Sequence, residues 1–436
     1  MRRVLLITSS YRPAMLADMQ RARMLSWELP ALGWEVEVLA PAAGEIRTDA
    51  LEPDHAGFFP AIEMVHEAGS LLRTAFELIG SRSPAWRTLR PMDMRARALL
   101  KSGRFDLVYF STTTFSYLPL GERWKKKFGV PYVLDLHDPW VRSDSASGPK
   151  GWRARVAGAV HARMERSAVV NAAGLVAVSP AYLEAMKLRY ESLNPGWLAS
   201  ARHAVIPFGA LASDLVEAAR MARPPDRGES RDIRLHYVGA GGPIMVRSFS
   251  LLCRALASLR KRNHSLVDRV RVRLFGTTYD WKPGKPKALE AAAWEAGVGD
   301  LVEENPERVS YRRSLELLLE SDGALILGVD DSGYMPSKLF GYALSGKPLL
   351  ASLRQDGPAY AFCRDNPELG RALRFGGADE MSVEEASRVI EAFLQDAAQR
   401  RIINRREVLE PYLAPAMARR HVELFDACLK PAAVAA

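Results

Sequence analysis

Short apolar runs of strand length alternate with amphipathic stretches along most of this chain. The first run, RVLLIT, covers Arg3–Thr8, and its lack of polar positions is typical of a strand that is buried on both faces. A helical period follows over Met19–Leu32, and EVEVLA at Glu35–Ala40 predicts a second strand. A strand, a helix and a strand in this order predict a β-α-β crossover, and therefore a parallel sheet with helices on its faces.

The same alternation continues to the end of the chain. In the first half it predicts further strands at Asp106–Phe110, Pro131–Leu136, Ala173–Val178 and His203–Pro207, and helices at Glu122–Phe128 and Pro180–Tyr190. In the second half it predicts strands at Ile233–Val238, Val270–Phe275, Ala324–Val329 and Pro348–Ala351, and a further strand that ends at Val309–Tyr311. It also predicts helices at Phe249–Lys261, Ala288–Ala296, Pro336–Ser345, Ser382–Asp396, Gln399–Leu409 and Ala414–Leu429. Two successive Rossmann-like, doubly wound α/β lobes fit this series better than one.

A break in composition separates the two series of elements. ARMARPPDRGESRD, at Ala219–Asp232, is charged, contains prolines and is poor in large apolar residues, which is typical of a linker. We therefore expect a first lobe over residues 1–215, a linker over 216–231 and a second lobe over 232–410. Ligands of such sheets bind beyond the carboxyl ends of the strands, so a cleft between two facing lobes is the expected active site.

Composition excludes several classes of protein. Of the 436 residues, 48% are apolar and 25% are charged, which excludes a wholly disordered or fibrous chain. The three cysteines, Cys253, Cys363 and Cys428, are scattered without CxxC spacing, which argues against a disulfide framework or a structural zinc site. The N-terminus has only the short apolar stretch VLLI, and no run reaches the ~18 apolar residues of a membrane span. We expect a cytoplasmic protein.

The most informative stretch is DDSGYMPSKLFGYALSGKPLLA, at Asp330–Ala351. A predicted strand ends just before it, and Pro336 stands where the first helical residue is expected. The amides of the first turn and the helix dipole would then form an anion site, to which Ser337 adds a hydroxyl and Lys338 a positive charge. The alternative is an ordinary, well-capped helix with a solvated lysine.

Six stretches, in the same order, resemble the GT-B glycosyltransferases, and especially their large retaining family four. P-S-K-L-F-x-Y-x-x-x-G-K-P-L-L-A is similar to the donor-site signature of that family. RVLLITSSYRP with GWEVEVLAP is similar to its opening, DLHDPW to the end of its central strand, AGLVAVSPAYLEAM and VIPFGA to the elements before its linker, and LHYVGAGG to the first turn of its donor lobe. The resemblance covers nearly the whole chain.

This resemblance implies a fold, a reaction and a set of ligands. The fold is GT-B, with a C-terminal helix at about 414–430 that returns to the first, acceptor-side lobe. The reaction is transfer of a sugar, with retention, from a nucleotide sugar to a hydroxyl of a lipid-linked or polysaccharide intermediate. The expected donor is a UDP- or GDP-sugar, and no other cofactor is expected.

Residue chemistry and the resemblance together place the donor in the second lobe. The diphosphate is assigned to Gly241, Gly242, Arg247, Pro336, Ser337 and Lys338, and the nucleotide or sugar to Gly276, Thr277, Tyr311, Asp330, Asp331, Gly333, Tyr334 and Gly341. Glycines let the backbone approach a phosphate. A tight turn in place of a phosphate loop, a packing role for the tyrosine and a solubility role for the two aspartates remain open as alternatives.

Two positions depart from the family pattern. The family usually carries two glutamates eight positions apart around this loop, and this chain has Gly333 and Gly341 there. The second glutamate normally holds the ribose of the nucleotide, and Asp330 or Asp331 can take over such a hydroxyl.

The first lobe offers a candidate catalytic pair, His137 and Asp138, where the strand within DLHDPW ends. The resemblance places His137 near the reacting sugar, as a hydrogen-bond partner or proton relay, and Asp138 can hold its imidazole or accept from a hydroxyl. A structural histidine is the alternative. The histidines show no metal-ligand spacing, and no metal is expected, because basic side chains and helix-end amides can take the charge of a leaving diphosphate.

Basic residues cluster in the first lobe, and the chain carries a formal net charge of +9. The clusters are Arg82 to Arg104, Arg123 to Lys127, and Arg153 to Arg166, with Trp86 and Trp152 nearby. They predict either solvated helix faces or docking on an anionic membrane surface that presents a lipid-linked acceptor. No aromatic-interleaved recognition motif supports nucleic acid, which is not an expected partner.

Two other functions remain open from the sequence. A nucleotide-sugar 2-epimerase of the same fold would need several acidic and histidine groups in the cleft, and few are present. A non-catalytic GT-B relative, acting as a partner or binding protein, is favoured by the missing glutamates.

Overall fold

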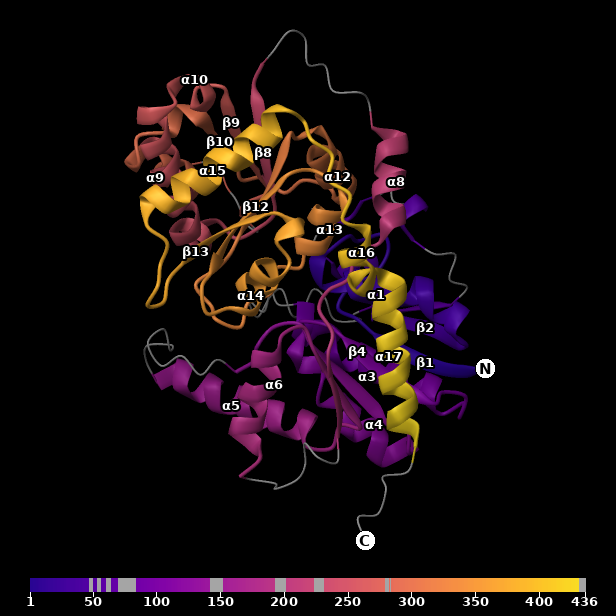
Figure 1. Cartoon of the computed structure of the whole chain (residues 1–436). Helices are drawn as coiled ribbons and strands as arrows, with labels where there is room; N and C mark the ends of the chain where they lie inside the picture. The colour runs from indigo at the N-terminus through magenta and orange to yellow at the C-terminus, as the bar shows by residue number, and fades with distance from the viewer. Residues whose placement is uncertain are drawn as a thin grey trace. The chain divides into compact units, whose positions relative to one another are not determined.

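The computed structural model describes residues 1–46, 50–52, 56–59, 64–69, 84–141, 152–192, 201–222, 231–278, 282 and 284–430. The chain divides into two units, one made of Met1–Phe208 with Ala414–Ala436, and the other of Gly209–Leu413. Each unit is built around one parallel sheet with helices packed on it (Figure 1). The predicted class, two doubly wound α/β lobes, is therefore confirmed.

The first unit contains a seven-stranded sheet with the order β3-β2-β1-β4-β5-β6-β7. Its strands are β1 (Arg2–Ile7), β2 (Trp34–Pro41), β3 (Val65–Ala68), β4 (Leu107–Ser111), β5 (Tyr132–Leu136), β6 (Gly174–Ala177) and β7 (Arg202–Val205). Its helices are α1 (Gln20–Glu28), α3 (Pro84–Leu100), α4 (Leu120–Phe128), α5 (Trp152–Val169), α6 (Pro180–Tyr190) and α17 (Ala414–Leu429). Strands β4 and β5 are buried along their whole length, because helices cover both faces of a parallel sheet.

Helix α17 returns from the end of the chain to the first unit, as predicted. It packs against α1 and β7, and Figure 1 shows it beside α1 and β1. Phe425 lies edge-on against Trp34, with ring centroids 5.4 Å apart. His421, one turn earlier, is fully buried.

The second unit contains a six-stranded sheet with the order β10-β9-β8-β11-β12-β13. Its strands are β8 (Ile233–Val238), β9 (Val270–Phe275), β10 (Val302–Asn305), β11 (Gly323–Leu327), β12 (Leu349–Arg354) and β13 (Arg371–Phe375). Its helices are α8 (Ala212–Met221), α9 (Val246–Arg262), α10 (His264–Val267), α11 (Ala288–Glu295), α12 (Tyr311–Glu320), α13 (Leu339–Leu344), α14 (Pro358–Asp365), α15 (Val383–Ala398) and α16 (Arg406–Leu409). The stretch predicted as a linker begins inside α8, and residues 223–230 lie outside the described residues.

Three predicted elements are wrong. The helix expected over Gln399–Leu409 is helical only in α16, because Arg400 takes a left-handed conformation (φ 52°) that ends α15. Val309–Tyr311 does not end a strand, since the Ser310 side chain caps α12 by accepting from the amide of Arg313. The third element is the helix expected to start at Pro336, which starts at Leu339. Within the described residues, no helix combines the length and the apolar character needed to cross a bilayer.

Candidate functional site

The loops after the strands of the second unit meet at the carboxyl edge of its sheet. Strand β8 leads into Gly239–Gly242, and β9 leads into Gly276–Thr278. The two turns are joined, because the amide of Gly241 donates to the carbonyl of Thr277 over 3.0 Å. Gly242 has a left-handed φ of 38°, and a Cβ there would lie 3.0 Å from the same carbonyl. The turn after β8 therefore requires glycine for both conformation and space.

Lys338 reaches back over this turn from the start of α13. A Cβ atom on Gly239 would lie only 1.6 Å from Lys338 Nζ, so the ammonium occupies the space that the glycine leaves. The ammonium also lies 5.7 Å from the centre of the Tyr237 ring. Burial lowers the pKa of Lys338 to about 8, because desolvation disfavours the charged form. The structure thus brings together two predicted site regions, the glycine turn and the lysine.

Tyr342 holds α13 in this position, and the sequence analysis did not identify it. Its hydroxyl donates to the carbonyl of Val238 over 2.9 Å and accepts from the amide of Val238 over 3.1 Å. Val238 directly precedes Gly239, and Tyr342 lies one helical turn after Lys338. Tyr342 is the tyrosine of the P-S-K-L-F-x-Y motif, which is the signal that could have identified it.

The predicted anion site at the start of a helix is corrected by the structure. Pro336 is not the first helical residue, because its carbonyl accepts from the amide of Leu339 in a turn that precedes α13. Helix α13 itself has only six residues. Pro336 is buried and Ser337 is exposed. The cation at this edge is therefore supplied by Lys338 together with the glycine turn, and not by the first turn of a long helix.

Arg247 takes part in a network of ion pairs at the same edge. It pairs with Asp330 over 2.9 Å and with Glu380 over 3.2 Å. Arg354 pairs with the other oxygen of Asp330 and with Asp356. Burial would raise the pKa of Asp330, but the two guanidinium groups lower it overall. Arg247 was predicted to meet the diphosphate, and in this structure its charge is already balanced by carboxylates.

The two aspartates of this loop have structural partners. Both carboxylate oxygens of Asp330 contact arginines, and Asp331 Oδ1 accepts from the amide of Gly333 over 2.8 Å. These contacts hold the loop between β11 and α13. Both carboxylates therefore already have partners in the protein, whereas they were expected to bind a sugar or ribose hydroxyl. Tyr334 follows in the same loop and is partly exposed.

The positions where the family has glutamates differ in their surroundings. Gly341 lies on α13, and a Cβ atom placed there would meet no atom within 4 Å. Gly333 is buried in the preceding loop. Space for a longer side chain therefore exists at Gly341.

Three further predicted residues, Gly276, Thr277 and Tyr311, lie in the segments that follow β9 and β10. The hydroxyls of Thr277 and Tyr311 both donate hydrogen bonds within the protein. Gly276 turns the chain after β9 with a φ of 67°. Thr277 is 1% exposed and donates to Glu304 Oε1 over 2.5 Å. Tyr311 donates to Asp214 of α8 over 2.6 Å. Thr277 and Tyr311 therefore hold loops and helices together in this structure, and their nucleotide roles stay predictions.

In the first unit, His137 is buried in a network under the end of β5. Its Nε2 atom lies 2.7 Å from Asp135 Oδ2 and 3.3 Å from the Ser111 hydroxyl. Arg21, on α1, pairs with Asp135 over 3.2 Å, and both side chains are fully buried. Burial by itself would raise the pKa of Asp135, but Arg21 and His137 hold it well below its usual range. The carboxylate that holds the His137 imidazole is therefore Asp135, and holding it was one of the two roles offered for Asp138.

Helix α17 completes this network from the end of the chain. His421 Nδ1 lies 2.7 Å from the carbonyl of Met417, and its Nε2 lies 3.3 Å from Arg21 Nη1 and 3.1 Å from the Tyr109 hydroxyl. Burial, with a contribution from the Arg21 charge, lowers the pKa of His421 to about 3, so this imidazole is neutral near pH 7. Tyr109 in turn donates to Asp135 over 2.7 Å.

The placement of His137 differs from the expectation of an imidazole open to a cleft. The residue is 4% exposed, and its ring packs edge-on against Phe208 at 5.1 Å. Its Nδ1 atom is buried and has no hydrogen-bond partner among the described residues. Asp138, one residue later, is exposed. Asp135 is the only charged residue of the apolar run PYVLDL. A charge inside a predicted buried strand was the signal that could have identified it.

Among the described residues, no group of three or more His, Cys, Asp or Glu side chains is placed to hold a metal ion. Lys338, Arg247 and Arg354 are three cations that lie at the sheet edge of the second unit.

Comparison with known proteins agrees with this architecture. Residues 19–209 match the family model described as a glycosyl transferase 4-like domain, so the resemblance is confirmed for this part of the chain. No curated protein matches the chain by sequence. The solved structures that are similar to it show the GT-B fold over both units, and the chain therefore has the GT-B fold.

Three similar structures illustrate this fold. HepE of Anabaena, in complex with UDP and glucose, is 15% identical with a TM-score of 0.62, over 98% of this chain and 100% of that one. Starch synthase IV of Arabidopsis thaliana, bound to ADP and acarbose, is 14% identical with a TM-score of 0.60, over 98% and 99%. A protein of Listeria monocytogenes assigned as a UDP-N-acetylglucosamine 2-epimerase is 12% identical with a TM-score of 0.52, over 96% and 94%.

Proposed function

We propose that this protein transfers a sugar, with retention, from a nucleotide-sugar donor to a hydroxyl of a lipid-linked or polysaccharide intermediate. The glycosyl transferase 4-like domain in residues 19–209 supports the reaction class. The GT-B fold supports a donor site at the carboxyl edge of the second sheet. HepE and starch synthase IV, which share this fold, hold UDP and ADP, which supports a nucleoside diphosphate as the leaving group.

The observation that carries the proposal is the Lys338 ammonium in the space left by Gly239. A partly desolvated cation beside a glycine turn can stabilise negative charge more strongly than one in water. In the proposed reaction the bond between the anomeric carbon and the phosphate oxygen breaks, and the acceptor oxygen forms the new bond. The leaving diphosphate gains negative charge, which Lys338 stabilises, and the acceptor's proton passes to a basic oxygen.

The arginines of the same edge extend this role. Arg247 is half exposed and paired with Asp330 and Glu380, and exposed ion pairs contribute little stability. A diphosphate can therefore replace one carboxylate as the partner of Arg247 at small cost. This supports a reaction in which protein cations, without a metal ion, take the charge of the diphosphate; the proposed donor is a UDP- or GDP-sugar.

Calorimetric titration with UDP, GDP and ADP tests the donor site. Lys338→Ala should weaken binding of the preferred diphosphate roughly 10- to 100-fold, the loss expected for a charged hydrogen bond, and leave binding of the free nucleoside unchanged. Lys261→Ala, which removes an exposed lysine from α9, is the matched control and should bind like the wild type. An equal loss of nucleoside and diphosphate binding in the Lys338 variant would count against the proposal.

A non-catalytic role is the second candidate, because Gly333 and Gly341 stand where the family usually has glutamates. A nucleotide-sugar epimerase of the same fold is the third, in line with the Listeria structure. Product analysis separates them. A glycosyltransferase consumes donor only with an acceptor, an epimerase converts donor without one, and a binding protein leaves the donor intact.

A further inference from the structure

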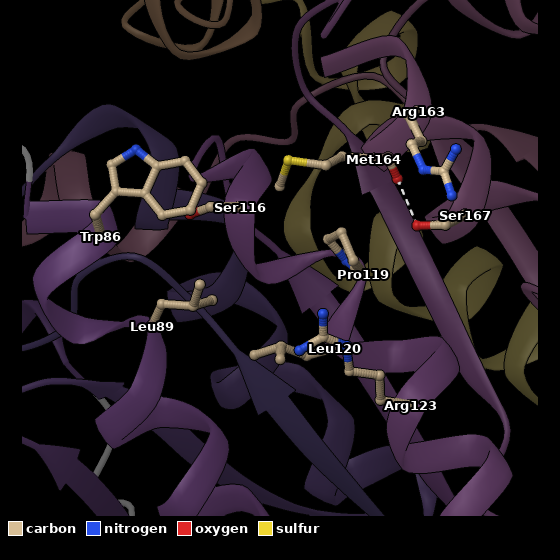
Figure 2. A pocket seen from close by; sticks show the side chains of 9 residues that line it. All are labelled: Trp86, Leu89, Ser116, Pro119, Leu120, Arg123, Arg163, Met164 and Ser167. Carbon is tan, nitrogen blue, oxygen red and sulfur yellow. Dashed lines mark hydrogen bonds between the residues drawn. The ribbon is translucent and has the colours of Figure 1, made fainter. Parts of the chain in front are cut away.

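An apolar groove lies in the first unit where α3, α4 and α5 come together. Leu89, Pro119, Leu120 and Met164 form its floor and sides, and Trp86 stands at one end (Figure 2). The groove encloses about 330 Å³. Trp86 is 48% exposed, although its indole borders an apolar space. All of its lining residues belong to the first unit, and none of them is a residue assigned to the donor site.

The exposed side of α5 continues the apolar surface of the groove. Trp152, Val156 and Val160 are spaced four residues apart and lead to Met164, so they form one row along adjacent turns. Their exposed fractions are 66%, 55% and 48%. A row of large apolar side chains in water is unfavourable, and such patches mark surfaces that meet another apolar phase.

Positive charge surrounds this apolar surface. Arg123 and Arg163 line the groove from α4 and α5 (Figure 2), and neither pairs with a carboxylate in the part of the chain that the structure describes. Arg90 on α3, Lys127 on α4, and Arg155 and Arg166 on α5 are also exposed. Cations beside tryptophan and aliphatic side chains are typical of helices that lie in the interface of an anionic bilayer.

We propose that the groove and the α5 row dock the first unit on an anionic phospholipid bilayer. Trp152, Val156 and Val160 enter the interface, one acyl chain occupies the groove, and Arg123 and Arg163 bind lipid phosphates. The excess of positive charge on this surface favours an anionic bilayer over a second copy of the chain, because a second copy would bring like charges together. The role of this docking rests on the proposed function, because a bilayer would present a lipid-linked acceptor to the enzyme. Binding to the bilayer does not depend on that function.

The same helix also holds the loop that follows His137. The indole Nε1 of Trp140 donates to Nδ1 of His161 over 2.8 Å, and the amide of Val141 lies 3.4 Å from Glu165 Oε1. Trp140 also stacks on Phe115, with ring centroids 5.2 Å apart. A bilayer that fixes α5 therefore also fixes the loop at the end of β5, which links docking to the candidate acceptor side.

Vesicle co-sedimentation of the full chain, without donor, tests the proposal. Vesicles of phosphatidylcholine alone are compared with vesicles that also contain phosphatidylglycerol. The wild type should bind the anionic vesicles more tightly, and added salt should weaken this binding. Arg123→Gln with Arg163→Gln should weaken it roughly 30-fold, at about 1 kcal/mol for each basic residue near the surface. Trp152→Ser with Val156→Ser should weaken it roughly tenfold or more.

Matched controls lie on the second unit. Arg388→Gln with Arg406→Gln removes the same charge from exposed positions, and Trp294→Ser removes an exposed tryptophan. Both should bind vesicles like the wild type, and all variants should keep the wild-type unfolding temperature because the altered residues are exposed. Equal binding to both kinds of vesicle, an equal loss in the controls, or loss of self-association in place of vesicle binding would overturn the proposal. Diphosphate titration of the same variants reports on the proposed function separately.

Discussion

Each unit holds a network of charged side chains, and the two networks differ in how much water reaches them. Arg21 and Asp135 of the first unit are fully buried, whereas Arg247 and Asp330 of the second are 50% and 43% exposed. A buried pair is costly to break because its remaining member is left without water, whereas an exposed pair contributes little. The first network therefore fixes the position of His137, and the second can exchange a partner for a charged ligand.

The largest expected effect comes from breaking the buried network. Asp135→Ala leaves Arg21 buried without its carboxylate, which should lower the free energy of unfolding by about 3–5 kcal/mol. Urea denaturation measures it, and Asp138→Ala, at an exposed neighbouring position, should change stability by less than about 0.5 kcal/mol. Replacing both partners, Arg21→Met with Asp135→Leu, removes the unpaired buried charge and should cost less than Asp135→Ala, although His137 and Tyr109 still lose their carboxylate partner. Equal stability of the two single variants would contradict the structural role of the buried network.

A smaller effect is expected from Tyr342, which joins α13 to β8. Tyr342→Phe removes two hydrogen bonds to Val238 and should cost about 1–3 kcal/mol. It should also weaken diphosphate binding, because Lys338 loses its position over Gly239. Tyr132→Phe is the matched control, since it removes a buried bond to the carbonyl of Ala168 in the first unit. The control should lose stability without losing affinity, and a loss of affinity in both variants would contradict the positioning role of Tyr342.

The pH dependence of binding distinguishes the second unit further. Because the pKa of Lys338 is lowered to about 8, its ammonium is charged below that pH and loses its proton above it. A bound diphosphate favours the charged form, so affinity should be constant just below pH 8 and fall about tenfold per pH unit above it. Calorimetry across this range measures the slope. In Lys338→Arg, whose guanidinium stays charged, the slope should vanish, and a slope that persists would assign the titration to another group.

The smallest effect on stability is expected from the exposed network. Asp330→Asn removes the carboxylate shared by Arg247 and Arg354 and should change the free energy of unfolding by less than about 1 kcal/mol. Diphosphate affinity should rise roughly fivefold, the effect of one nearby charge in water. Weaker binding in this variant would instead assign Asp330 to the ligand itself.

Much of the fold could be predicted from the sequence. The strand predicted at Ile233–Val238 and the helix predicted at Pro180–Tyr190 match the structure residue for residue, because a short apolar run and a proline at the start of a helix are signals that do not depend on distant contacts. The helix expected from Pro336 starts three residues late. A proline can begin a helix, but here its carbonyl closes a turn first.

The candidate site was harder to predict because it depends on partners far apart in the sequence. Lys338 was identified from a local motif, but its contact with Gly239 joins positions nearly 100 residues apart. Arg247 was identified as a cation, but its carboxylate partners come from two other loops. Asp135 and His421 were missed, since folding brings Asp135 of β5 to Arg21 of α1, and the return of α17 adds His421.

The sequence by itself determined the two α/β lobes, the identity of their main strands and helices, and the glycine turn and lysine that make the second unit a candidate donor site. These features are written in short patterns, because strand burial, helix amphipathicity and turn chemistry are local properties. Only the tertiary structure decided which charges are neutralised, which imidazole is buried and where apolar side chains stay in water. Charge pairing and burial depend on which residues folding brings within a few ångströms of one another, and spacing along the chain does not record this.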